Sequence, residues 1–348
     1  MPAVYPSAQN TYIRSHEATN NMVVDYSRNI DKFAVNQYTQ MIPVDKQNGY
    51  YLEMTIEEAG RLLHTDGKNF LWMDRMPAPE GNDGLEKFEY KPYDCDRYAI
   101  PVLLGDLTID QASWNILAQH TRIKSQQAMT FRTQQAVTTI TTSGNYDSSH
   151  VLDVTSDISD NQGTWAESTT ARQDIKRSLN YGRELILDDT LAAVDLDDLL
   201  LVISSGLAAK LIECQEIVDY IKASPDSTAQ VRGELPGRNV MYGLPDRLYG
   251  MPIVVEATRK VTTKKGASTT TRSSVMPDDN ACMLSRPGGL IGVDGAPSFS
   301  TITFFMKEEM TVETKRDDDN RRTKARVVEN YDVKLTAPAS GILFTETS

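Results

Sequence analysis

Polar stretches and short apolar runs follow one another along the chain, a pattern that predicts a mixture of helices and strands. Residues 1–47 hold their apolar side chains singly in a polar background, without a helical or strand period. Such a stretch buries too little surface by itself to offset the entropy of ordering it. It nevertheless carries large apolar residues: Tyr5, Tyr12, Ile13, Val23, Val24, Tyr26, Phe33 and Tyr38. We expect an N-terminal arm that lies along a surface of this subunit or of another one.

A long excursion with strand character at both ends follows the arm, at residues 48–95. It opens at residues 49–52 and closes at residues 89–93, with a dense cluster of turn-forming residues at 75–84. A loop of this length without a core of its own is usually functional. We therefore expect an extended hairpin that reaches away from the body of the protein.

The clearest single element is a long helix predicted over residues 108–142. Thr108 and Gln111 have the spacing of a capping box, and neither Gly nor Pro interrupts the stretch. A helix of this length would span roughly 50 Å. It has a thin apolar stripe that includes Phe131, few charges, and many Gln and Thr residues. A long helix of this composition is typical of one that is contacted on several sides.

The second half of the chain alternates between helical and strand patterns. Residues 199–203 form a continuous apolar run typical of a strand buried on both faces, and Ser204 and Ser205 cap the helix after it. Further helices are predicted at 168–186 and 215–222. Further strands are predicted at 98–104, 251–255, 281–284, 302–306, 311–314, 331–335 and 341–344. Between residues 168 and 255 this is an α/β pattern, followed by a return of β-strands.

Composition excludes several classes of protein. The 348 residues carry 36 Lys and Arg against 48 Asp and Glu, a net charge of −12, which argues against a protein that clamps phosphates. No apolar run approaches the ~18–20 residues of a membrane span, and the start of the sequence does not have the pattern of a secretion signal. Three distant cysteines argue against a disulfide scaffold and fit a reducing compartment.

Motifs for catalysis or cofactor binding are not recognisable in the sequence. The nucleophile elbow, the phosphate-binding loop and the dinucleotide fingerprint are all missing. Residues 157–163 resemble half of a calcium loop, but Gly163 comes one place late and Ser168 stands where Glu is needed. Cys95 lies between Asp94 and Asp96, which should raise its pKa and make it a poor nucleophile. We therefore expect no catalytic residues, no metal and no cofactor.

Two charged stretches stand out near the end of the chain. In the run from 315 to 326, Asp317, Asp318 and Asp319 could gather a divalent ion, but basic residues surround them: Arg316, Arg321, Arg322, Lys324 and Arg326. A salt-bridged hairpin tip is the favoured interpretation. Residues 259–274 form a basic stretch that we interpret as a solvated loop or one that meets an acidic neighbour.

The order of these parts resembles the major capsid proteins of tailed phages, with the Hong Kong 97-type fold. Residues 49–51 through 75–77 look like the extension loop of that family, and the helix from Thr108 looks like its spine helix. Trp165 with Asp174 and Ile175, followed by 200–204 and 217–222, is similar to its axial-domain run. The stretch 248–255 resembles the following strand, although the acidic stretch 188–198 departs from the pattern.

The resemblance implies an α+β fold with four parts. They are the arm (1–47), the extension loop (48–95), a peripheral domain (96–143 and 300–338, with the spine helix at 108–142), and an axial domain (144–299 and 339–348). It also implies a self-assembling protein that forms pentamers and hexamers of an icosahedral virion shell, built in the host cytoplasm. Scaffold, portal and decoration proteins would be its partners, and DNA would be enclosed without sequence-specific binding.

The same resemblance implies where subunits meet. The expected contact residues are Pro77, Pro79, Gly81, Gly84, Phe131, Arg316, Asp317, Asp318, Asp319, Arg321 and Arg322. Some relatives join subunits by Lys–Asn cross-links, but nothing in the spacing here requires one. Two other interpretations remain open: an α/β binding protein or enzyme with a pocket in 170–300, and another virion component such as a tail-tube protein.

Overall fold

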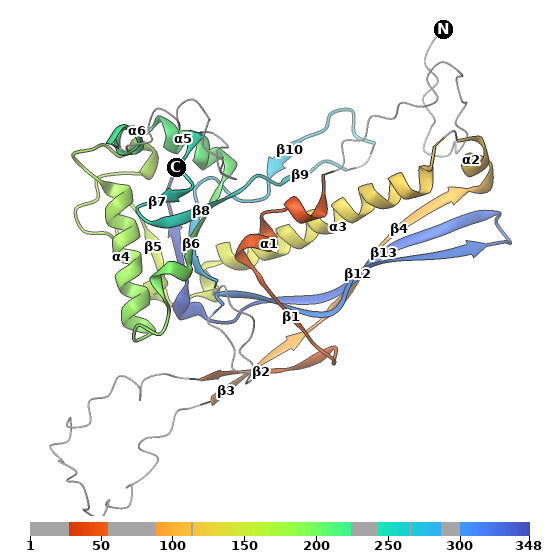
Figure 1. Cartoon of the computed structure of the whole chain (residues 1–348), viewed down its shortest axis with the longest axis horizontal. Helices are drawn as coiled ribbons and strands as arrows, with labels where there is room; N and C mark the ends of the chain where they lie inside the picture. Colours follow the sequence, from red (N-terminus) through yellow and green to blue (C-terminus); the bar gives the residue numbers. More distant parts are fainter. Residues whose placement is uncertain (1–27, 55–87, 113, 224–242, 265, 287–299) are drawn as a thin grey trace, which may run out of the picture.

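Two sheets, one of four strands and one of six, organise the part of the chain that the structure describes. The computed structural model describes residues 28–54, 88–112, 114–223, 243–264, 266–286 and 300–348. In Figure 1 the four-stranded sheet is long and lies beneath helix α3, whereas the six-stranded sheet forms a second body with helices α4, α5 and α6.

The four-stranded sheet is built around a long antiparallel hairpin. Its strand order is β1 (Gln40–Pro43), β12 (Ile302–Asp317), β13 (Arg322–Leu335) and β4 (Asp96–Gly105). Strand β1 is parallel to β12 and pairs only with residues 303–306, so the rest of β12 extends beyond it. The inner end of β12 is buried and its outer end is exposed, which follows the change from Phe304 and Phe305 to charged residues.

The long helix is interrupted, so the prediction that one helix runs from Thr108 is wrong at that end. Helix α2 covers Asp106–Gln111 and helix α3 covers Ile116–Thr141. The side chain of Asn115 caps α3 by accepting a hydrogen bond from the Ala118 N–H at 3.0 Å. The break lets α2 and the start of α3 pack on the same strand, because Ile116 is buried against Val102 and Leu104 and Ile109 packs there too.

Six threonines of α3 satisfy their own hydroxyl groups. Each donates to the carbonyl oxygen four residues earlier, at 2.8–3.0 Å. They are Thr121, Thr130, Thr133, Thr138, Thr139 and Thr141. Because each of these hydroxyls donates within the helix, the threonines leave few unpaired donors on the helix surface. The arrangement explains how a long helix can carry so few charges.

The six-stranded sheet has the order β5, β14, β11, β6, β8, β7. Its central strand β6 (Leu199–Ser204) is buried at every position and lies parallel to β8 (Met251–Glu256). The other strands are β5 (Val151–Asp153), β14 (Ile342–Thr345), β11 (Ala281–Ser285) and β7 (Arg247–Leu248). The apolar run 199–203 therefore forms the buried strand that its sequence predicts.

Helices α4 (Asp174–Asp189), α5 (Ser205–Glu213) and α6 (Gln215–Ala223) accompany this sheet. The Ser204 hydroxyl caps α5, as predicted, by accepting from the Leu207 N–H at 2.9 Å. Helix α4 begins later than the predicted 168. Single turns occupy the connections: Ser143–Asn145, Ser148–His150, Trp165–Glu167, Leu196–Asp198 and Pro338–Ser340.

The described part of the arm belongs to the core of its own subunit. After a turn at Ile30–Lys32, the short helix α1 (Val35–Tyr38) places Phe33 and Tyr38 at 1% and 0% exposure. The Tyr38 hydroxyl donates to the carboxylate of Glu256 at 3.3 Å. Burial is the first cause that raises the pKa of Glu256 above its ordinary value. This end of the arm is therefore a packed element and not a surface strap.

Two ribbons project from these sheets. The first pairs β2 (Asn48–Met54) with β3 (Phe88–Asp94), and the second pairs β9 (Arg259–Val261) with β10 (Arg272–Ser274). The basic stretch 259–274, predicted as a loop, is thus a two-stranded ribbon in the structure. Among the described residues, no helix is both long enough and apolar enough to cross a membrane.

Candidate assembly surfaces

The β2–β3 ribbon has one face on its own subunit and one face in solvent. On the inner face Tyr51 and Tyr93 stack on Phe305, with ring centroids 5.4 and 4.7 Å apart. On the outer face Tyr50 and Tyr90 are 71% and 68% exposed. Because side chains alternate along a strand, the stacking of the inner tyrosines fixes the outer two toward solvent. Exposed aromatic residues on a fixed scaffold are typical of a protein contact surface.

Four of the predicted contact residues come from the stretch 75–84, which is rich in turn-forming residues. Pro77, Pro79, Gly81 and Gly84 all lie outside the described residues. Their role in contacts between subunits stays a prediction. Tyr50 and Tyr90 were not among the predicted contacts, because single tyrosines in a polar strand give no sequence signal until the face that they occupy is known.

Phe131 and its neighbour Arg132 face opposite ways on helix α3. The Phe131 ring is 36% exposed and meets the ring of Tyr98 edge-on at 5.0 Å. Arg132 is 6% exposed, and its guanidinium lies 5.4 Å from the ring centre of Phe304 and 5.6 Å from that of Tyr331. One of the few charges of α3 is thus buried against the sheet, while Phe131 keeps part of an aromatic surface open.

The tip of the β12–β13 hairpin forms a network of ion pairs. Arg316 contacts Asp106 at 2.9 Å and Asp318 at 2.6 Å, which ties the hairpin to the start of α2. Asp317 contacts Arg322 at 2.8 Å and Lys324 at 2.5 Å. Hydrogen bonds from Lys324 and Arg322 hold the pKa of Asp317 well below its usual range.

This network agrees with the interpretation of a salt-bridged tip. Within the described residues, no group of three or more His, Cys, Asp or Glu side chains could hold a metal ion. Asp319 and Arg321 are exposed at the turn, and Arg321 has a left-handed backbone with φ of 44°. Contact between this tip and another subunit stays a prediction.

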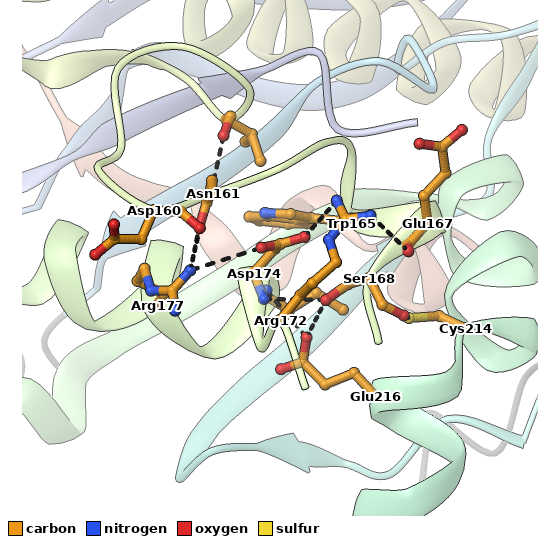
Figure 2. Close-up of polar contacts among 12 residues, drawn as sticks. Asp160, Asn161, Trp165, Glu167, Ser168, Arg172, Asp174, Arg177, Cys214 and Glu216 are labelled. Atoms are coloured by element: carbon orange, nitrogen blue, oxygen red, sulfur yellow. Dashed lines mark hydrogen bonds and ion pairs between the residues drawn. The ribbon is translucent and has the colours of Figure 1, made fainter. Parts of the chain in front are cut away.

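A buried polar cluster lies at the start of helix α4 (Figure 2). Gln173 precedes the helix with a left-handed φ of 52° and provides no side-chain cap. Instead, Glu216 from α6 accepts hydrogen bonds from the backbone N–H groups of Ile175 and Lys176, both at 3.1 Å. The Ser168 hydroxyl accepts from the Asp174 N–H at 3.0 Å and donates to Glu216.

The remaining groups of the cluster bring further segments to the same point. The Tyr249 hydroxyl donates to Glu216 at 2.6 Å, and burial is the first cause that raises the pKa of Tyr249. Asp174 has no exposed side-chain surface and contacts Arg172 at 2.7 Å and Arg177 at 3.7 Å. The carboxylate of Glu216 thus accepts from four protein donors, which is the arrangement of a helix cap supplied by a distant residue.

The three cysteines are buried and unpaired. The pKa of Cys95 is raised, as the sequence predicted, but burial is the first cause and Asp332 the second, ahead of Asp94. Its thiol donates to the Phe305 carbonyl at 3.4 Å. A buried thiol with a raised pKa is a poor nucleophile.

An open groove of about 480 Å³ lies between the turn at Ile30, the first half of α3 and the outer end of β12. Its walls include Leu117, Ala118 and Val312. None of its lining residues belongs to the 170–300 stretch, where the interpretation as a binding protein or enzyme expects a pocket.

Comparison with known proteins gives a clear result only at the level of structure. No protein-family model matches the chain, and no curated protein matches it. A phage-related protein from Bordetella bronchiseptica RB50 superposes with a TM-score of 0.59 at 13% identity, over 91% of this chain and 92% of that one. The bacteriophage PhiM1 mature capsid gives 0.54 at 12% identity, over 99% and 96%. The capsid of cyanophage P-SCSP1u gives 0.55 at 11% identity, over 98% and 96%.

The chain has the Hong Kong 97-type capsid fold. This confirms the predicted α+β fold class. The similarity covers 99% and 98% of this chain and 96% of each of the two capsid chains, so it is not confined to one domain. At identities of 11–13% the similarity is one of fold.

Proposed function

We propose that this chain is a major capsid protein that assembles through pentamers and hexamers into the icosahedral shell of a phage virion. The observation that supports it most is the whole-chain similarity to capsid structures, at 99% and 98% coverage for the PhiM1 and P-SCSP1u capsids. A fold alone does not determine function. The exposed tyrosines of the β2–β3 ribbon add a surface that a single subunit leaves uncovered.

In this proposal α3 is the spine helix, the β2–β3 ribbon begins the extension loop, and the two sheets belong to the peripheral and axial domains. The function is assembly and not turnover, so no catalytic residue, metal or cofactor takes part. Many modest contacts, repeated by symmetry, close the shell. The protein assembles in the host cytoplasm with scaffold, portal and decoration proteins as partners.

The acidic charge fits a container for DNA that does not bind it. At a net charge of −12, the chain has no excess of cations with which to neutralise phosphates. An acidic inner wall would leave incoming DNA free to move. The DNA would thus be the contents of the shell and a poor ligand for its subunits.

Electron microscopy of the purified, expressed protein tests the proposal. Round shells or rings of five and six subunits are expected. Tubes would indicate a tail-tube protein, and small featureless particles with a saturable ligand would indicate a binding protein or enzyme. Either of these two results would overturn the proposal.

A further inference from the structure

Two exposed segments of the six-stranded body carry equal and opposite charge. The basic ribbon, residues 259–272, contains five Lys and Arg and no acidic residue; one of the five, Lys265, lies outside the described residues. The acidic segment, residues 188–198, contains five Asp and no basic residue. In a chain with a net charge of −12, a ribbon of five cations is a local exception that calls for a partner.

Within the described part of the chain, these charges are not neutralised by one another. Arg259 donates to the hydroxyl of Ser205 at 3.1 Å, and no acidic side chain pairs with Lys260, Lys264 or Arg272. In the acidic segment Asp189 contacts His150 at 2.6 Å. No Lys or Arg among the described residues pairs with the others: Asp188, Asp195, Asp197 and Asp198.

Both segments also expose apolar side chains beside their charges. Val261 of the ribbon is 59% exposed, and Leu191 and Leu196 of the acidic segment are each 44% exposed. Leu191 follows helix α4 in a left-handed conformation with φ of 50°, a position that glycine normally occupies. A bulky residue held there presents its side chain at the expense of backbone strain, which is a pattern found at functional positions.

The topology prevents the two segments of one subunit from meeting. Strands β6 and β8 are parallel, the acidic segment leads into the start of β6, and the ribbon leaves the far end of β8 beside Ser205. In Figure 1 the ribbon projects above α3, whereas the chain leaves α4 at the lower left of the body. The segments therefore lie at opposite ends of the sheet and can meet only between molecules.

We propose that the basic ribbon of one subunit binds the acidic segment of a neighbouring copy of the same chain. Equal and opposite charge with an apolar centre matches the two surfaces to each other. A contact between different surfaces of identical subunits is head-to-tail, and it closes into a ring when the rotation between neighbours brings the last subunit back to the first. This inference rests on the proposed function, because it names a contact that would build the pentamers and hexamers.

Charge reversal tests the contact. The double variants Lys260→Glu/Lys264→Glu and Asp195→Lys/Asp197→Lys should each lower the assembled fraction about tenfold or more, because like charges then face each other. All four substitutions in one chain restore the attraction and should restore assembly. Lys210→Glu/Lys222→Glu, on helices α5 and α6, is the matched control and should assemble normally. Sedimentation measures assembly, and circular dichroism verifies that every variant folds.

Leu191→Gly separates folding from assembly. Glycine adopts the left-handed backbone without strain, so the subunit should keep or gain stability while its assembled fraction falls. A disulfide cross-link tests directly whether the two segments lie next to each other. The native cysteines are all buried, so they should not compete with the introduced pair. In the variant Val261→Cys/Leu191→Cys, oxidation should produce a ladder of covalent oligomers up to closed rings.

Several outcomes would overturn the contact. Charge-reversed variants that assemble like the unmodified chain, or a cross-link that stops at dimers, would exclude a head-to-tail ring. A ribbon variant that assembles normally but loses binding to a DNA duplex would make nucleic acid the partner of the ribbon. If the unmodified chain makes no particles, the proposed function fails; a missing ladder in the concentrated protein would then reject the contact separately.

Discussion

Helix α4 receives no cap from the residue directly before it, because Gln173 is in a left-handed conformation and its side chain makes no cap hydrogen bond; Ser168 accepts only from the Asp174 N–H. Glu216 takes over this role from a different helix, 41 residues further along the chain from Ile175. The side chain is 4% exposed and all its donors belong to the protein. One buried carboxylate therefore sets the position of α4 relative to α6.

Glu216→Ala should destabilise the subunit by about 2–3 kcal/mol, because it leaves buried N–H groups without acceptors. Urea unfolding measures the change. Glu213→Ala, at an exposed position of α5, is the matched control and should change stability by less than about 0.5 kcal/mol. Equal changes in the free energy of unfolding for the two substitutions would contradict the role of Glu216 as the cap of α4.

Glu256 should make the free energy of unfolding of the subunit depend on pH. Burial raises the pKa of this carboxyl in the folded protein, so folding favours its protonated form. The stabilisation from this group is present below the ordinary pKa of 4.5 and is lost as pH rises through the raised folded value. Glu256→Gln should therefore be more stable than the unmodified chain near neutral pH, with the difference vanishing as pH falls toward 4.5.

Tyr38→Phe is the companion variant for this site. It removes the hydroxyl that donates to the buried carboxyl of Glu256 and should lower the free energy of unfolding by about 1–3 kcal/mol. Thermal unfolding at several pH values checks both variants. A difference between Glu256→Gln and the unmodified chain that does not change with pH would contradict the role of burial.

At the scale of elements, strands were easier to predict than helix boundaries. The run 199–203 became a fully buried strand, because a short continuous run of apolar residues suits a strand that is covered on both faces. The capping box at Thr108 was misleading, since its local chemistry is as good as that of Asn115. The choice depended on how Ile109 and Ile116 pack on Val102 and Leu104, a contact that the local sequence does not encode.

Asn115→Ala tests where the long helix begins. Loss of the cap should lower the free energy of unfolding by about 1 kcal/mol, whereas Asn115→Asp should retain the cap and the stability. Urea unfolding distinguishes the two variants. Equal stability of the alanine variant and the unmodified chain would contradict the role of Asn115 as the cap of α3.

Candidate contact surfaces were harder to predict than the fold. The salt-bridged hairpin tip followed from the mixed charges between 315 and 326, because neighbouring opposite charges pair across a turn. The role of Glu216 as the cap of helix α4 could not be predicted, because the N–H groups that it accepts from are distant in sequence. Tyr50 and Tyr90 could not be found either, because only the stacking of Tyr51 and Tyr93 on Phe305 decides which face is exposed.

At the scale of the whole molecule, the exposed face of the β2–β3 ribbon should matter for assembly and not for folding. Tyr50→Ser/Tyr90→Ser removes two side chains that are about 70% exposed, so the subunit should fold with unchanged stability. Shells should be lost, as seen by electron microscopy. Glu89→Ser, on the same ribbon, is the control.

Deletion of residues 76–84 tests the loop tip on the same scale. The subunit should remain folded, because the inner face of the ribbon still stacks on Phe305, and it should no longer make shells. Normal particles from this deletion would contradict the role of the tip. Unfolding of the deleted protein would instead show that the loop belongs to the core.

The threonines of α3 give the molecule a helix that can exchange one environment for another. Because their hydroxyls donate to the helix backbone itself, these threonines keep the same hydrogen bonds in water and against a protein neighbour. A lysine or glutamate in the same places would lose hydration on every new contact. In the proposed shell, the long helix would gain or shift its neighbours while the hydrogen bonds of these threonines stay unchanged.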